Sequence, residues 1–197
     1  MAYTIVYMRD PYAHILLDDE KEILIRLRPD CFPNTVNSFV FLCRNGVYRD
    51  HSIERIVPGY VIDASYTAFH NSLAKYLIAN ESGSPLSETA PLPVPGTICM
   101  GGYDGLIAGG EFFFPLSASE KIIGNYPAFG EVEKGMDIIL LWEKAELCPV
   151  VSPYGADVVI NAPVDPIVIA DIVIEPNGHV FSKPVRMKDV PLPVSWK

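Results

Sequence analysis

The segment Arg26–Asp63 decides the fold, and it reads RLRPDCFPNTVNSFVFLCRNGVYRDHSIERIVPGYVID. Pro33 suits the first turn of a helix, where its missing N–H costs no hydrogen bond. Four apolar residues then recur at the i, i+3, i+4, i+7 spacing of one helical face: Val36, Phe39, Val40 and Cys43. Asn45-Gly46 ends the pattern, because glycine accepts the positive φ that closes a helix. The segment therefore predicts one amphipathic helix set between β-rich runs.

Short β-rich runs lie on both sides of this helix and predict a mainly β fold. Turn residues separate neighbouring runs, as Pro58-Gly59 does between two of them. The expected strands are His14–Leu17, Glu22–Leu27, Ile53–Val57, Tyr60–Ala64, Thr97–Met100, Glu111–Leu116, Ala128–Val132 and Ile167–Ile174. A second helix is expected over Lys134–Lys144, and its apolar residues on nearly every side predict that it is largely buried. Many short strands with two separate helices favour a barrel or sandwich over repeated βαβ units.

The stretches rich in proline or glycine are expected to be loops. These are Pro85–Pro95, Gly101–Gly110 and Pro149–Pro166. We divide the chain into one domain at residues 1–176 and a proline-containing C-terminal tail at residues 177–197. Two interpretations of Pro191–Trp196 stay open: docking in the groove of its own or a neighbouring barrel, or a disordered or surface-packed terminus.

Composition limits the classes of function. The chain has 197 residues, which suits one domain, and half of it is apolar (49%), enough for an ordinary core. Its formal net charge of -9 repels phosphate backbones, so we expect no nucleic-acid partner. No apolar stretch reaches the ~18 residues of a membrane-spanning helix, so we expect no membrane partner.

Cysteine and histidine spacing gives no sign of a metal or cofactor. The four cysteines form no CxxC pair, and the four histidines are scattered without metal-ligand spacing, so we expect neither a metal nor a cofactor. Reduced, mostly buried thiols are typical of the cytoplasm. The N-terminus shows no basic region followed by a long apolar run, so no signal peptide is expected and we predict a cytoplasmic protein.

Four further sequence blocks give this pattern a specific interpretation. They are Arg55–Tyr60 (RIVPGY), Gly96–Met100 (GTICM), Gly109–Phe114 (GGEFFF) and Tyr126–Asp137 (YPAFGEVEKGMD), preceded by Pro33–Phe39 and Gly46–Tyr48. In this order and at this spacing they resemble the cyclophilins, the peptidyl-prolyl cis-trans isomerases, over roughly Ala13–Ile174. The resemblance implies a mainly β fold: a closed eight-stranded antiparallel β-barrel capped by two α-helices.

The resemblance also implies a function, rotation about X–Pro peptide bonds during protein folding. The partners would be proline-containing peptides or unfolded protein chains. Arg55 matches the family's catalytic arginine, whose charged guanidinium offers a rigid fork of hydrogen-bond donors. The positions that match the family's substrate-binding residues are Tyr60, Val61, Asp63, Gly101, Gly102, Tyr103, Glu111, Phe113, Ile122 and Tyr126. Among these, Gly101, Gly102 and Tyr103 match the strand end that pairs with a substrate backbone.

Several positions depart from the family pattern. Asp63 and Glu111 stand where the family usually has glutamine. A carboxylate beside Arg55 either locks the guanidinium in a salt bridge or orients it, and the sequence leaves both open. Lys121 replaces the family's drug-contacting tryptophan, so we expect weak cyclosporin binding.

Two other functions compete with an isomerase. The first is a catalytically weak or inactive module that binds proline peptides on the same barrel, as the changed polar positions suggest. The second is a related barrel with a small-molecule role, for which Gly101–Gly110 suggests a phosphate loop. That run lacks the following Lys-Ser/Thr and a helix start, which disfavours a nucleotide site.

Overall fold

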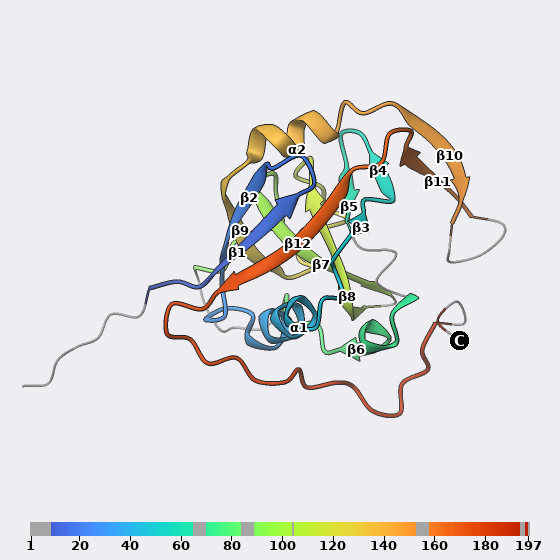
Figure 1. The fold of residues 1–197 in the computed structure, drawn as a ribbon. Coiled ribbons are helices and arrows are strands. Elements are labelled where there is room, and N and C mark those ends of the chain that lie inside the picture. The colour runs from blue at the N-terminus through green and yellow to red at the C-terminus, as the bar shows by residue number, and fades with distance from the viewer. Residues whose placement is uncertain are drawn as a thin grey trace, which may run out of the picture.

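The computed structural model describes residues 9–64, 70–83, 89–103, 105–152, 158–193 and 196. Figure 1 shows a strongly curled antiparallel sheet with α1 below it and α2 above it. The helices are α1 (Pro33–Arg44) and α2 (Met136–Trp142), with a short 3-10 turn at Ser72–Ala74. The strands are β1 (Tyr12–Leu17), β2 (Glu22–Leu27), β3 (His51–Ser52), β4 (Arg55–Val57), β5 (Val61–Asp63), β6 (Leu77–Ile78), β7 (Thr97–Tyr103), β8 (Leu106–Pro115), β9 (Ala128–Lys134), β10 (Leu147–Val151), β11 (Val159–Pro163) and β12 (Val168–Glu175).

The main sheet curls because the two strands at its opposite edges, β3 and β4, follow each other almost directly in the chain. Its order is β3-β12-β1-β2-β9-β7-β8-β5-β4, with β6 paired to β8 off this path. Only Ile53 and Glu54 separate β3 from β4, at opposite ends of that order. The result is mainly β, as expected, but the sheet is a half-barrel. In the part of the chain that the structure describes it has ten strands rather than the expected eight.

Strand alternation puts the core on the inner face of the curl. On β8, Phe112 and Phe114 are fully or almost fully buried in the main core, while Phe113 between them belongs to a separate cluster on the other face. The predicted apolar stripe of α1 faces the core, because Val36, Phe39 and Val40 are 0% exposed and Cys43 is 5% exposed. The Phe39 ring packs against the rings of Tyr48, Phe112 and Phe129 at centroid distances of 5.8, 5.6 and 5.0 Å.

The prediction of a glycine-rich loop at Gly101–Gly110 is wrong. It is largely strand, since β7 continues to Tyr103 and β8 begins at Leu106. The glycines mark close contacts instead. A Cβ on Gly102 would lie 1.9 Å from the Leu106 carbonyl oxygen, and one on Gly109 would lie 2.2 Å from Cε2 of Tyr76. Here glycine lets a backbone and a ring approach that any side chain would block.

A two-stranded hairpin replaces most of the expected loop at Pro149–Pro166. Its strands β10 and β11 pair antiparallel from Leu147 opposite Pro163 to Val151 opposite Val159. The hairpin extends from the upper right of the sheet in Figure 1, and β11 packs against β4. We call it the β10–β11 arm.

Helix α2 is shorter and less buried than expected. Gly135, at φ 93°, precedes it, and the helix ends at Trp142. Ile138, Ile139 and Trp142 face the core, but Leu140 and Leu141 are 44% and 58% exposed. Within the described residues, no helix combines the length and the apolar character that crossing a membrane requires.

The C-terminal tail runs along α1 and across the bottom of the molecule (Figure 1). The Asn37 side chain accepts a hydrogen bond from the Ser182 N–H, and Asn34 exchanges two with the Val185 backbone. Trp196, only 4% exposed, packs in a small cluster with Leu77, Ala108 and Ile160. The described tail is thus surface-packed; Val194 and Ser195 of the segment considered for groove docking lie outside the described residues.

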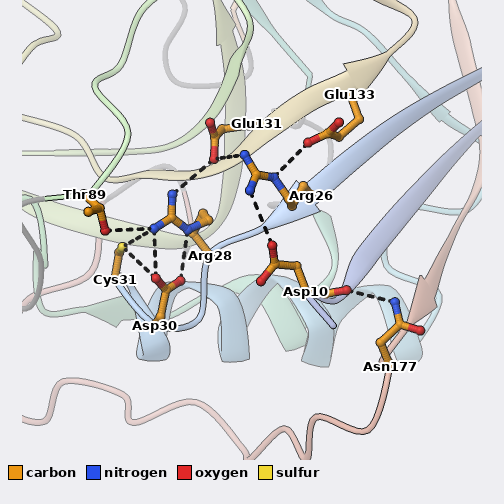
Figure 2. A network of polar contacts seen from close by, with 9 residues as sticks. All are labelled: Asp10, Arg26, Arg28, Asp30, Cys31, Thr89, Glu131, Glu133 and Asn177. Atoms are coloured by element: carbon orange, nitrogen blue, oxygen red, sulfur yellow. Dashed lines mark hydrogen bonds and ion pairs between the residues drawn. The ribbon is translucent and has the colours of Figure 1, made fainter. Parts of the chain in front are cut away.

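A network of charged side chains ties β2 to β9 and to the entry of α1 (Figure 2). One oxygen of Glu131 accepts hydrogen bonds from Arg26 at 2.9 Å and from Arg28 at 3.2 Å. Arg28 also donates a hydrogen bond to Asp30 at 2.8 Å, and these contacts raise the pKa of the Arg28 guanidinium. This network lies on elements other than β4, β5 and β8, so it stabilises the sheet without entering the site described next.

Candidate active site

One row of residues crosses four strands on the outer face of the sheet. Arg55 on β4 is opposite Asp63 on β5, which is opposite Phe113 on β8, which is opposite Cys99 on β7. Since neighbours along a strand point to opposite faces, the intervening residues face the core while this row faces away from it. The pairing register therefore aligns a cation, an anion and an aromatic ring on one surface.

Three members of this row, Arg55, Asp63 and Phe113, line a pocket of about 430 Å³. Nine of the ten predicted substrate-binding positions and the predicted catalytic arginine line it: Arg55, Tyr60, Val61, Asp63, Gly101, Gly102, Glu111, Phe113, Ile122 and Tyr126. The tenth, Tyr103, ends β7, and only that backbone position is described. The structure thus brings the sequence-predicted positions together, although they come from strands and turns far apart in the chain.

The floor of the pocket is a second apolar cluster, distinct from the main core. Its buried members are Val61, Cys99, Phe113, Ile122 and Ala128, with Val57, Tyr60 and Tyr126 packed against them. The rings of Phe113 and Tyr126 meet edge-on, at a centroid distance of 5.5 Å and an interplanar angle of 87°. Such a rigid apolar floor can hold a small saturated ring of the size of proline.

Arg55 and Asp63 form an ion pair at the rim of this floor. The Nη1 group of Arg55 donates a hydrogen bond to Oδ2 of Asp63. The Asp63 side chain is only 6% exposed, while that of Arg55 keeps 27% of its surface exposed. Burial raises the pKa of Asp63, and the adjacent guanidinium opposes that rise. Asp63 thus holds one corner of a guanidinium that still reaches the open pocket.

A second carboxylate gives the pocket an acidic side. Glu111, 7% exposed, lies over Gly101 so closely that a Cβ there would be 2.9 Å from its Cδ. The pKa of the Tyr126 hydroxyl is raised, first by burial and then by the negative charges of Glu111 and Asp63. Both acids that replace the expected glutamines therefore act on the same pocket.

The β10–β11 arm supplies the part of the pocket that sequence reasoning missed. Its lining residues are Ser152, Val158, Val159 and Ile160. The assignment of Pro149–Pro166 to a loop rested on its prolines, which concealed two runs of β-branched residues around Val150 and Val159. Those runs were the available signal for a hairpin.

The described side chains offer no obvious place for a metal. Among them, no group of three or more His, Cys, Asp or Glu residues stands close enough together to hold an ion. What the pocket does offer is a fixed cationic donor beside a rigid apolar floor. This combination suits binding a neutral ring whose attached polar group changes its orientation.

The match to a known family spans most of the chain. Residues 12–172 match the family described as "Cyclophilin type peptidyl-prolyl cis-trans isomerase/CLD". The chain belongs to this family, as the sequence blocks around Arg55 and Phe113 predict.

Individual relatives are distant. The chain is 26% identical over 143 residues to "Peptidyl-prolyl cis-trans isomerase CYP71" of Arabidopsis thaliana, covering 73% of this chain and 23% of that relative. The chain thus spans less than a quarter of that relative's length. It is also similar to a crystal structure of a Cryptosporidium parvum cyclophilin type peptidyl-prolyl cis-trans isomerase, at a TM-score of 0.67 and 18% identity, covering 85% and 98% of the two chains. A structure of that protein in the presence of the dipeptide Ala-Pro matches at a TM-score of 0.65 and 19% identity, covering 83% and 98%.

Proposed function

We propose that this chain catalyses cis–trans isomerisation of X–Pro bonds in peptides and unfolded protein chains, with Arg55 as its catalytic residue. The observation that carries the proposal is the cross-strand row. It places the Arg55 guanidinium beside Asp63 on the neighbouring strand, and Phe113 on the strand after that. Membership of the family and the Ala-Pro dipeptide used with a structural relative support the same substrate class.

The reaction needs only stabilisation of a twisted amide. Rotation about an X–Pro bond crosses a barrier of ~20 kcal/mol, and at its top the nitrogen gains a lone pair as resonance is lost. A donor aimed at that nitrogen binds the twisted state better than either planar one. One charge-assisted hydrogen bond is worth about 1.5–3 kcal/mol, or about 10- to 150-fold in rate. The remaining acceleration would come from the preorganised pocket.

Asp63 fits the role of a positioning residue. The guanidinium has five N–H donors in a planar fork, and the contact with Asp63 Oδ2 engages one of its terminal nitrogens. Because Arg55 lines the pocket and keeps 27% of its side chain exposed, it can be held by Asp63 and still present donors to the pocket. The alternative function, a binding module without catalysis, is favoured by the same pair if the bond to Asp63 competes with the substrate.

A bound peptide would lie along the end of β7. Gly101 and Gly102 line the pocket on a part of β7 that pairs with β8 but lies past Cys99, where the register with β9 ends, so an extended chain could pair along that edge. Tyr60, Val61, Phe113 and Ile122 would enclose the proline ring, while Glu111 and Tyr126 border the rest. Lys121 stands where the family's tryptophan contacts cyclosporin, so we expect weak binding of that drug and tighter binding by Lys121→Trp in a fluorescence titration.

The proposed compartment is the cytoplasm. Its support is chemical: no disulfide joins Cys31, Cys43, Cys99 or Cys148, and Cys31, Cys43 and Cys99 are buried. Burial raises the pKa of the Cys43 and Cys99 thiols, which keeps them in the unreactive protonated form.

The decisive experiment is exchange NMR on an Ala-Pro-containing peptide with wild type, Arg55→Ala and a control. Arg49→Ala is the control, because Arg49 is an exposed arginine that pairs with Asp171 and does not line the pocket. We expect wild type and Arg49→Ala to accelerate exchange equally, and Arg55→Ala to lose at least about tenfold. Binding without acceleration by folded wild type, across several residues before proline, would establish the binding module instead.

A further inference from the structure

A second pocket lies against the β10–β11 arm, next to the proposed isomerase site, and Ile160 lines both. It has a volume of about 400 Å³ and is formed between the β3–β4 connection and the arm. Its lining is mainly apolar: Ile53, Val150, Val151, Ile160, Ala162, Pro163 and Pro166, with Ser52 and Glu54 as the polar side chains among the described residues. Nothing in the proposed isomerisation uses it.

Glu54 makes this pocket chemically specific. Its Oε2 atom is shielded from solvent and has no hydrogen-bond partner among the residues the structure describes. Burial raises the pKa of this carboxyl to about 7. A carboxylate held among apolar groups carries a desolvation cost that a cationic partner would offset. The pocket therefore favours a ligand with a positive charge at the end of an apolar stem.

Lysine and arginine side chains have this shape. Their methylene stems pack against apolar surface while the charged head reaches a polar group. Ile53, Val150 and Ala162 would surround the stem, and Glu54 would bind the head. A neutral aliphatic side chain would leave the half-buried carboxylate unpaired, so the pocket discriminates by charge as well as by shape.

The second pocket neighbours the first. Ile160 of β11 lines both, and Glu54 directly precedes Arg55 in the chain. The arm between them exposes Val151 and Val159 by 64% and 63%, so an apolar surface joins the two pockets. One extended peptide, rising about 3.3 Å per residue, can span such neighbouring sites with side chains a few residues apart.

We propose that the second pocket binds a lysine or arginine side chain of the client peptide, near the proline held in the first pocket. The identity of the client as a proline peptide rests on the proposed function, whereas the affinity of the pocket for an aliphatic cation does not. Basic residues flanking proline would thus be selected by Glu54 and the β10–β11 arm.

The first test uses a probe without proline. Hexylammonium and hexanol are titrated separately into the ¹⁵N-labelled full chain, with Glu54→Gln as the variant and Glu146→Gln as the control. Glu146 is exposed and does not line the second pocket, so its change removes one negative charge without altering this site. We expect hexylammonium to shift the amides of Ile53, Val150 and Ala162 and to bind about tenfold more weakly to Glu54→Gln only. Equal binding of hexanol, an unchanged affinity in Glu54→Gln, or shifts confined to other residues would each overturn the proposal.

The second test measures selectivity with the proposed substrate class. Peptides that carry lysine, or norleucine with the same four-carbon stem and no ammonium group, at two or three residues from a single proline are compared for affinity. Wild type and Glu146→Gln should prefer a lysine peptide about fivefold or more, and Glu54→Gln should show no preference. Absence of a preference in wild type contradicts the proposal. Absence of exchange catalysis with the preference intact would refute only the isomerase activity, so the two failures are distinguishable. Matching ¹H–¹⁵N spectra of the free variants show that each has folded.

Discussion

Asp63 couples the rigid sheet to the guanidinium that we propose as the catalytic donor. Replacing it with asparagine keeps the shape and removes the charge that holds Nη1 of Arg55. We expect kcat/KM for an Ala-Pro peptide to fall about three- to tenfold in Asp63→Asn, with most of the loss in kcat, because a freer guanidinium is aligned less often. Exchange NMR over a range of peptide concentrations measures both constants. A gain in activity would instead show that the ion pair restrains the wild-type site.

Glu54 makes stability depend on pH in a direction opposite to that of a paired carboxylate. Its folded pKa of about 7 exceeds the ordinary value of 4.5, so between these pH values the folded state binds more protons than the unfolded state. Stability from this group is therefore lost as the pH rises. Urea unfolding should find Glu54→Gln similar to wild type near pH 4.5 and more stable by about 1–2 kcal/mol near pH 8, after allowance for partial exposure. The same difference at both pH values would contradict this assignment.

At the scale of the elements, the small residues of β7 and β8 decide whether the site face can form. Gly109→Ala would place a methyl group 2.2 Å from Cε2 of Tyr76, whose hydroxyl bonds to buried Ser38. We expect a loss of about 2–4 kcal/mol in the free energy of unfolding, because neither β8 nor the ring can move without breaking core contacts. Gly83→Ala is the control, since nothing lies within 4 Å of that position, and it should change stability by less than about 0.5 kcal/mol. Urea denaturation gives both values, and equal effects would remove the steric explanation.

The elements also show what a sequence can reveal. The apolar stripe of α1 and the Arg55–Tyr60 block can be predicted from the sequence, because helix periodicity and a local motif each lie within one short segment. The β10–β11 arm could not be predicted in this way, because its prolines indicate a loop. Its strands are defined by their pairing with each other and by packing on β4, which lies far earlier in the chain. The role of Gly109 is hidden for a similar reason: its partner, Tyr76, is far away in the chain. The wall formed by Val158–Ile160 and the environment of Glu54 thus follow from tertiary packing that no local pattern contains.

At the scale of the whole molecule, the C-terminal tail links the underside of the fold to the site. It is bonded to α1 through Asn34 and Asn37, and its Trp196 packs beside Ile160 of the arm. Ile160 lines both pockets, so the tail supports the wall that they share. Long-range support of this kind acts on affinity by keeping a wall in place, without contact with the substrate.

Trp196→Ala tests this link. Removing the buried indole should lower the free energy of unfolding by about 2 kcal/mol, less than the cost in a central core because the cluster is small. It should also weaken proline-peptide affinity about two- to fivefold, since the arm would close the pocket less often, while kcat for bound peptide stays near the wild-type value. Val180→Ala, at a tail position that is 95% exposed, should leave stability and affinity unchanged. Thermal unfolding and a fluorescence titration measure the two effects. A loss of stability with unchanged affinity would mean that the tail only fastens α1, and that the arm holds its place over β4 through its own packing.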